Sequence, residues 1–291
     1  MDGAILIAEC GATKCDWCLA SVSGERRFRT PGLNAAFLSR EAASDLMASV
    51  ALSVHSAYSD TFPAICPDEV HHIWFYGAGL TAGTGEIMMR ELFSAHFPDA
   101  ELHFESDLMA ACRALLGHEA GIAGILGTGS NSCLYDGTSF TRTVYSGGFI
   151  LGDEGSGAVA GRMLLSDYLK HELPSSLEKA FNERYGLNYQ TIVRKVYSEP
   201  SPSRWLASLA LFLADNREDD YVRNLLRNNF SAYIGRQLLK YDVEKYSVSI
   251  AGSFGYEFRD MIAELGERKG IRFRRFLASP LDALVEYHLA P

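Results

Sequence analysis

The sequence predicts an α/β protein in which one order of elements, three strands followed by alternating helices and strands, occurs twice. Three observations support this prediction. The 291 residues exceed the ~100–200 residues of a typical single domain. Short apolar runs that end at glycine turns alternate with segments of helical periodicity. The same order then begins again near residue 121. We therefore expect two α/β domains that share a cleft, with a helical insertion in the second.

The first half is expected to have the order βββαβαβα. Its strands are short apolar or alternating runs, and Ser39 is a predicted N-cap for the first helix. The predicted elements are strands 4–8, 16–20 and 26–30, helix 39–56, strand 71–76, helix 85–96, strand 101–105 and helix 107–116.

The second half repeats this order but not the residues. Asp136-Gly137 is a strong hairpin signal between two of its strands. Helical patterning with breaks at proline then dominates residues 154–241, which we interpret as an insertion. The predicted elements are strands 121–126, 131–135 and 138–145, the helical region, strand 247–251, helix 256–269, strand 271–276 and a helix from residue 280.

Composition and charge exclude several classes of protein. Hydrophobic residues make up 47% and charged residues 22% of the chain, which is typical of globular proteins and excludes a disordered chain. The formal net charge of −9 argues against a nucleic-acid or anionic-membrane partner. No apolar run approaches the ~20 residues of a membrane span. Six Cys without a secretory leader indicate a reducing compartment, so we expect a soluble cytoplasmic protein without disulfides.

The Cys and His residues do not follow known metal-binding spacings. Cys15 and Cys18 form a CxxC, but no second pair follows at finger spacing, and alternation along a strand puts the two on opposite faces. A metal or redox role for this pair is the minor alternative. The eight His show no HExxH or comparable spacing. We therefore expect no metal site built from His.

Two glycine-containing hairpin turns are candidate phosphate sites. In the first, residues 9–14, small residues expose backbone N–H groups while Thr13 offers a hydroxyl and Lys14 a charge. It lacks the spacing of a Walker loop, and an ordinary tight hairpin is an equal alternative. In the second, residues 127–131 (GTGSN), the same chemistry occurs at the equivalent hairpin of its half. The repetition favours a phosphate-binding role for both turns.

Three further positions are candidates for binding or catalysis. Asp153 lies in the densest glycine cluster, residues 147–157, where it either caps a helix or binds a small molecule. Asp107 follows a strand and begins a helix, so it is either an N-cap or a general base for a hydroxyl group. Gly252-Ser253 follows a late strand, which suits either a nucleotide lying against bare backbone or a simple strand-to-helix turn.

Taken together, these motifs resemble the N-acetylglucosamine kinase branch of the BadF/BadG/BcrA/BcrD-type ATPases, within the sugar kinase, actin and heat-shock ATPase superfamily. Residues 5–17 are similar to the first phosphate motif of that family, and residues 124–132 to its second. Residues 147–161 are similar to its GDEGSG segment, and residues 251–254 to its adenosine motif. The pair GTGSN and LGDEGSG at this separation is the most specific part of the resemblance.

The resemblance implies a duplicated ribonuclease H-like, actin-like ATPase fold with ATP and Mg²⁺ bound between the halves. The implied domains are 1–111 plus 281–291 on the sugar and phosphate side, and 112–280 on the nucleotide side. The implied activity is phosphorylation of the 6-hydroxyl of N-acetylglucosamine or a close amino sugar by a homodimer. The implied roles are catalysis by Asp107; ATP phosphate binding by Gly11, Ala12, Thr13, Lys14, Gly127, Thr128 and Gly129; adenosine binding by Gly252 and Ser253; sugar binding by Asn34, Gly77, Asp107, Asn131, Gly148 and Asp153; and Mg²⁺ binding by Glu9, through water.

The sequence departs from the family pattern where Glu9 replaces Asp, Cys10 and Cys15 replace small or hydroxyl residues, and Ser253 replaces Gly. Two other functions therefore stay open. One is an activator ATPase that powers a partner reductase through an iron–sulfur cluster, which requires Cys at a subunit interface. Cys112 lies instead in a predicted helix, and Cys133 in a predicted strand. The other is a non-catalytic sugar sensor, against which the retention of Asp107 argues.

Overall fold

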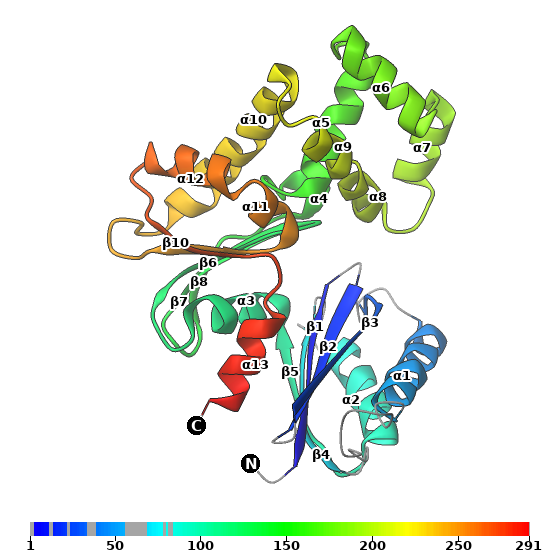
Figure 1. The fold of residues 1–291 in the computed structure, drawn as a ribbon, viewed down its shortest axis with the longest axis vertical. Coiled ribbons are helices and arrows are strands. Elements are labelled where there is room, and N and C mark those ends of the chain that lie inside the picture. Colours follow the sequence, from blue (N-terminus) through cyan, green and yellow to red (C-terminus); the bar gives the residue numbers. More distant parts are fainter. Residues whose placement is uncertain are drawn as a thin grey trace. The chain divides into compact units, whose positions relative to one another are not determined.

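The chain forms two compact units in the computed structural model, which describes residues 3–11, 14–21, 24–33, 39–55, 69–77, 80 and 84–290. The first unit is Met1–Gly117 with Pro280–Pro291, and the second is His118–Ser279 (Figure 1). Each unit is built on its own five-stranded sheet. None of the helices formed by described residues has the length and hydropathy that a bilayer crossing requires.

The first unit is a mixed sheet with helices on both faces. The strand order is β3-β2-β1-β4-β5, in which β1 is antiparallel to β2 and parallel to β4. Helices α1 and α2 cover one face, whereas α3 and α13 lie against the other (Figure 1). The elements are β1 Ala4–Cys10, β2 Lys14–Ser21, β3 Gly24–Pro31, α1 Arg40–His55, β4 Val70–Gly77, α2 Thr84–His96, β5 Glu101–Ser106, α3 Asp107–Leu116 and α13 Leu281–Leu289.

An aromatic cluster forms the core beneath α1 and α2. Trp17 is fully buried, and its ring centroid lies 6.0 Å from that of Phe75 and 6.3 Å from that of Phe93. The buried indole N–H donates to Thr30 Oγ1 over 2.9 Å, so its polar group is satisfied. Cys10 and Cys15 belong to the same core cluster. The two thiols that depart from the family pattern are therefore packing residues of the sheet.

The second unit repeats the sheet of the first. Its order, β8-β7-β6-β9-β10, has β6 antiparallel to β7 and parallel to β9. The strands are β6 Gly121–Leu126, β7 Ser130–Tyr135, β8 Phe140–Thr143, β9 Val248–Ala251 and β10 Phe273–Leu277. The same order and directions in both units confirm the predicted α/β duplication.

Helices fill the long interval between β8 and β9 (Figure 1). They share one large apolar core with the sheet, in which Phe181 and Phe212 make an edge-on contact at 5.2 Å between ring centroids. The helices of this unit are α4 Gly148–Leu151, α5 Gly157–Tyr168, α6 Ser175–Tyr185, α7 Tyr189–Tyr197, α8 Pro202–Ser208, α9 Ala210–Asp215, α10 Asp220–Arg236, the 3₁₀ turn η3 Leu238–Lys240, α11 Ser253–Glu257 and α12 Arg259–Glu267.

Local hydrogen bonds explain where element bounds differ from the prediction. Strand β8 begins later than expected because Asp136 Oδ1 accepts the backbone N–H groups of Thr138 and Ser139, which extends the hairpin turn. Gly137 has a φ of +107° within that turn, as the Asp-Gly signal predicts. The single helix predicted over 256–269 is wrong, since α11 and α12 are separated at Phe258.

Candidate functional site

In the first unit, three parallel strands end at one edge of the sheet. Cys10 at the end of β1 pairs with Gly77 at the end of β4, and Gly77 pairs with Ser106 at the end of β5. Glu9 precedes Cys10, and Asp107 follows Ser106. The carboxyl edge of parallel strands is where open α/β sheets commonly bind ligands. Three predicted site residues, Glu9, Gly77 and Asp107, thus lie at an edge suited to a ligand.

Glu9 is a largely buried carboxyl group among other acids. Its burial, together with the negative charges of Asp16 and Asp107, raises the pKa of Glu9 to about 7, against an opposing effect of the Lys14 ammonium. An acid in such surroundings gains from a bound cation, because the cation offsets both the desolvation and the repulsion. Carboxylate oxygens are also the ligands that Mg²⁺ prefers. The surroundings of Glu9 therefore fit a magnesium site.

Asp107 is not the N-cap of α3, which was one of the two roles that the sequence left open for it. Ser106 is the N-cap of α3, and its Oγ accepts the N–H of Met109 over 3.1 Å. Asp107 is the first helical residue, with Oδ1 accepting the N–H of Leu108 over 2.8 Å. Burial raises the pKa of Asp107, and among the described residues its carboxylate has no ion-pair partner. Such a carboxylate is suited to accept a proton.

Asp16 is a residue at this edge that the sequence analysis missed. It is 7% exposed and lies opposite Glu9 in the β1–β2 register. It accepts from Lys14 Nζ over 2.6 Å and from Arg29 Nε over 2.5 Å. Although burial opposes ionisation, these bonds lower the pKa of Asp16. Asp16 therefore holds the Lys14 ammonium beside Glu9. The sequence signal that could have identified Asp16 is the alternation of side chains along β2.

In the second unit, the GTG turn is held by helix α5. Leu126 pairs with Ser130, and Gly127 N–H donates to Gly129 O over 3.0 Å, so the loop is three residues long. The first N–H groups of α5 donate to the turn: Gly157 N–H to Gly127 O over 2.9 Å and Ala158 N–H to Thr128 O over 3.1 Å. These bonds fix the backbone of the turn against the start of a helix.

Asp153 lies beside this turn. It is 8% exposed and has a φ of +52°, and its Oδ1 accepts the N–H of Ser130 over 3.3 Å. A Cβ on Gly129 would lie 3.0 Å from Asp153 Oδ2, so the approach favours glycine there. Ser156, not Asp153, is the N-cap of α5, which excludes the capping explanation for Asp153. The structure therefore brings the GTG turn and Asp153 together.

The glycine cluster around Asp153 is clamped by helix α10. Asn229 accepts the N–H of Gly155 over 2.8 Å and donates to Ser156 O over 3.0 Å. A Cβ on Gly155 would lie 2.7 Å from Tyr233 Cβ, so only glycine lets α10 approach. The unusual backbone of Asp153 is thus maintained by its neighbours, as is common at ligand sites.

Ser130 is a second residue that the sequence analysis did not assign. Its Oγ is buried and has no hydrogen-bond partner among the described residues. Buried hydroxyls without a partner are costly, and they occur where a ligand completes the bonding. The adjacent Asn131 uses Oδ1 to accept the N–H of Ser132 over 2.9 Å. The Ser130 hydroxyl is therefore a polar group with spare hydrogen-bonding capacity beside Asp153.

The turn at Gly252 lies directly against the GTG turn. Gly252 has a φ of +116°, and a Cβ there would lie 2.4 Å from Leu126 O. The turn then begins α11 at Ser253. The predicted adenosine and phosphate turns of this unit are therefore adjacent.

The other predicted residues lie at strand and helix ends or outside the described residues. Gly11 donates its N–H to Lys14 O over 2.9 Å in the first hairpin. Gly148 begins α4, and its carbonyl accepts the N–H of Gly152 over 2.8 Å, one residue before Asp153. Outside the described residues are Ala12, Thr13 and Asn34.

A separate cavity of about 340 Å³ lies between the α4–α5 segment and α10. Its lining includes Leu151, Met163 and Arg236, and it contains none of the predicted site residues.

Comparison with known proteins gave matches among solved structures only. No protein-family model matches the chain, and no curated protein is similar to it in sequence. A structure from Porphyromonas gingivalis named "Putative N-acetylglucosamine Kinase" is 34% identical over 98% of both chains, with a TM-score of 0.89. One of the same name from Chromobacterium violaceum is 20% identical over 98% of this chain and 99% of that one, with a TM-score of 0.71. A ROK family glucokinase from Streptomyces griseus, in complex with glucose and AMPPNP, is 15% identical over 98% of both chains, with a TM-score of 0.58. The last two share the fold.

Proposed function

Because this chain belongs to the same family as the Porphyromonas gingivalis protein and has the sugar-kinase fold of the actin-like ATPase superfamily, we propose that it transfers the γ-phosphoryl group of ATP to the 6-hydroxyl of N-acetylglucosamine. The observation that carries the proposal is the 34% identity to that protein over 98% of both chains. Asp107, a partly buried carboxylate at a strand end, and the GTG turn support it further. They would supply the two chemical requirements, a base and a backbone that binds phosphate.

In the proposed reaction the oxygen of the sugar hydroxyl attacks the γ-phosphorus while Asp107 accepts the hydroxyl proton, and ADP leaves. Positioning and neutralisation of phosphate charge supply most of the rate in such transfers. Lys14, with Gly11, Ala12 and Thr13, would bind the phosphates, and Gly127, Thr128 and Gly129 would do so as well. Glu9 would hold Mg²⁺ through water, and the ion would supply positive charge to the phosphates.

Sugar binding is proposed for Asp153 and its neighbours. Asp153 has a fixed backbone and a buried carboxylate that can accept sugar hydroxyls. Gly148 and Asn131 flank it in the same unit, and Asn34 and Gly77 contribute from the first. We add the Ser130 hydroxyl, whose lack of a partner among the described residues supports a ligand contact. Gly252 and Ser253 lie against the adenosine.

Two other functions make different predictions. A non-catalytic sugar sensor would bind the sugar without turnover, since one fold hosts several functions. An activator ATPase would need thiols for an iron–sulfur cluster, but Cys112 and Cys133 are fully buried in α3 and β7. Burial of these thiols disfavours the activator.

A coupled assay of ADP release, run with Mg²⁺ and a panel of amino sugars, tests the proposal. We expect release that depends on the sugar and is fastest with N-acetylglucosamine. Sugar binding without release would support the sensor instead. An anaerobic visible spectrum with cluster absorbance would support the activator ATPase.

A further inference from the structure

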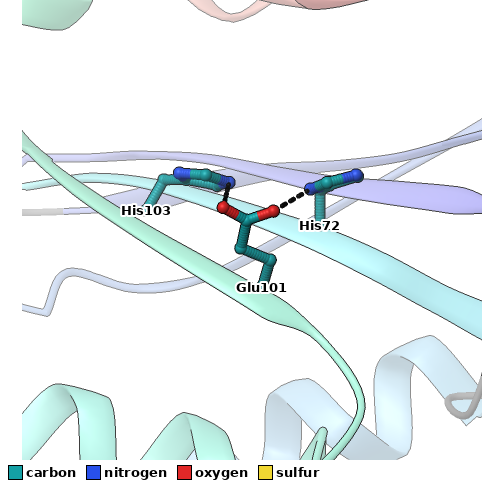
Figure 2. Close-up of side chains that lie close together, drawn as sticks. All are labelled: His72, Glu101 and His103. Atoms are coloured by element: carbon teal, nitrogen blue, oxygen red, sulfur yellow. Dashed lines mark ion pairs between the residues drawn. The ribbon is translucent and has the colours of Figure 1, made fainter.

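Three side chains with metal-binding groups meet on the first unit, away from the proposed catalytic edge. His72 comes from β4, and Glu101 and His103 come from β5 (Figure 2). His72 and Glu101 are partners in the parallel register, and His103 is two residues further along β5, on the same face as Glu101. Glu101 is the first residue of β5, whereas Asp107 follows its last. The cluster therefore lies at the opposite end of β5 from the proposed base.

The spacing of the three groups is compatible with a coordination shell. Glu101 Oε2 lies 3.3 Å from His72 Nδ1, and Glu101 Oε1 lies 3.6 Å from His103 Nε2. One atom from each residue lies within 4.8 Å of the others. Zinc bonds to nitrogen and oxygen are about 2.0–2.2 Å long, so neighbouring ligands of a tetrahedral ion are roughly 3.4 Å apart. An ion can therefore be accommodated without rearranging the strands.

One of the three groups also lacks an ordinary partner. His103 Nε2 is buried and makes no hydrogen bond within the described part of the chain. Its 3.6 Å separation from the Glu101 carboxylate is too long for a hydrogen bond. A metal ion between them would satisfy this buried nitrogen.

We propose that His72, Glu101 and His103 form a site for a divalent transition-metal ion of the zinc class. Two imidazoles and one carboxylate favour zinc over Mg²⁺, which prefers oxygen ligands alone. The His72 and Glu101 side chains are 43% and 65% exposed, so an ion can enter and a water can complete the shell. The bound ion would join β4 to β5 and stabilise the first unit.

The surroundings of His103 support the binding of a metal. Its ring stacks on Trp74, with 3.8 Å between centroids, which fixes the orientation of the imidazole. The nearby Arg113 guanidinium, whose charge would oppose a bound cation, is paired with the Glu105 carboxylate at 2.9 Å.

The spacing of His in the sequence could not have revealed this site. The ligands come from two strands about thirty positions apart, and the parallel pairing of β4 with β5 brings them together. We expected no metal site built from His because the eight His show no metal-binding spacing along the sequence.

The test is titration of the full-length protein with Zn²⁺ in excess Mg²⁺, which occupies sites made of oxygen ligands. Calorimetry measures binding, and Co²⁺ serves as a second probe through its visible absorption and quenching of Trp74 fluorescence. We expect one equivalent to bind and raise the Tm. Because losing a second-shell partner alone costs 10–100-fold, losing a ligand in Glu101→Gln or His103→Gln should weaken binding by about 100-fold or more. Glu101 is exposed, so its variant tests the site even if His103→Gln does not fold.

His171→Gln is the matched control. His171 Nδ1 lies 2.7 Å from Glu178 Oε1 in the second unit, and this pair belongs to no three-ligand cluster among the described residues. The control should bind Zn²⁺ like the wild type. Absence of stoichiometric binding to the wild type, or equal affinity of the wild type and Glu101→Gln, would overturn the proposal and leave an ion-pair cluster only.

Discussion

The folded protein disfavours the ionised form of the Glu9 carboxyl group. Its pKa is raised to about 7 in the fold, against an ordinary value near 4.3. Below the ordinary value the group is protonated whether the chain is folded or unfolded. As the pH rises toward 7, only the unfolded chain releases the proton, so folding loses stability, and the full loss is present above pH 7.

We therefore predict that Glu9→Gln increases the free energy of unfolding by about 3 kcal/mol at pH 8 and changes it little at pH 4.5. Urea denaturation in EDTA measures both values. Adding Mg²⁺ at pH 8 should stabilise the wild type more than the variant. Asp45→Asn, at an exposed position of α1, controls for the loss of one carboxylate. An equal effect of Glu9→Gln at the two pH values would contradict the explanation.

His288 has the opposite linkage to pH. Burial, with the nearby charges of Arg113 and His103, lowers its pKa to about 3. Its Nε2 shares a hydrogen bond of 2.7 Å with Tyr76 Oη, which also accepts from Arg113 Nη1 over 2.6 Å. A His that must stay neutral in the fold stabilises it above pH 6.5, and this contribution is lost as the pH falls from 6.5 toward the folded pKa.

The wild type should therefore lose about 1–2 kcal/mol of stability from this group between pH 7 and pH 5. His288→Phe keeps an aromatic ring against Trp74 but removes the titration. The variant should be less stable than the wild type at pH 7, because Tyr76 loses a hydrogen-bond partner, yet it should lose less stability on acidification. Thermal unfolding at the two pH values measures this. Parallel losses in the two proteins would exclude His288 as the source.

The residue types of the proposed site were predictable, but their partners were not. Asp107 and Asp153 stand out because each carboxylate follows a strand or interrupts a run of glycines. Asp16 and Ser130 did not, because their significance depends on a neighbour in another strand or segment. The sequence likewise left capping open for both acids, and only the geometry assigns the caps to Ser106 and Ser156.

The turn after strand β9 should keep its conformation only while position 252 has no side chain. Its φ of +116° strains any other residue, and a Cβ would lie 2.4 Å from the carbonyl oxygen of Leu126. We predict that Gly252→Ala costs more than about 2 kcal/mol of unfolding free energy, since strain and overlap add. It should also weaken ATP binding, because the displaced backbone belongs to the GTG turn. Chemical denaturation and nucleotide titration measure the two effects.

Gly270→Ala separates conformational strain from overlap. Gly270 has a φ of +77°, but nothing lies within 4 Å of the position that a Cβ would take. Alanine there should cost only about 1 kcal/mol. Equal costs at 252 and 270 would show that contact with Leu126 contributes nothing.

Most elements were predictable because their ends carry local signals. Strand 121–126, helix 107–116 and the Asp136-Gly137 turn agree with the structure. The helical interval was predictable as a region but not as separate helices. There, Pro202 at the start of α8 is a local signal, but α11 ends without a glycine or proline. A bound of the second kind follows from packing against the core, which periodicity does not report.

At the scale of the whole molecule, the duplication was predictable from element order alone. The two sheets have the same order and directions although their residues do not repeat. The reason is physical: a strand order is set by connection lengths and by burial, which many sequences satisfy. The proposed function is more demanding, since it requires particular side chains, above all a carboxylate at position 107 that accepts a proton.

Asp107→Asn tests that requirement most directly. The substitution keeps the shape of the side chain but removes its capacity to accept a proton. Sugar-dependent ADP release should fall by about 10²–10⁴-fold, while calorimetry should find the sugar Kd within a few-fold of the wild type. Ser106→Ala, which removes only the cap, should lower stability by about 1 kcal/mol and leave turnover nearly intact. Unchanged turnover in Asp107→Asn, or loss of sugar binding in proportion to turnover, would contradict the assignment of this residue as the base.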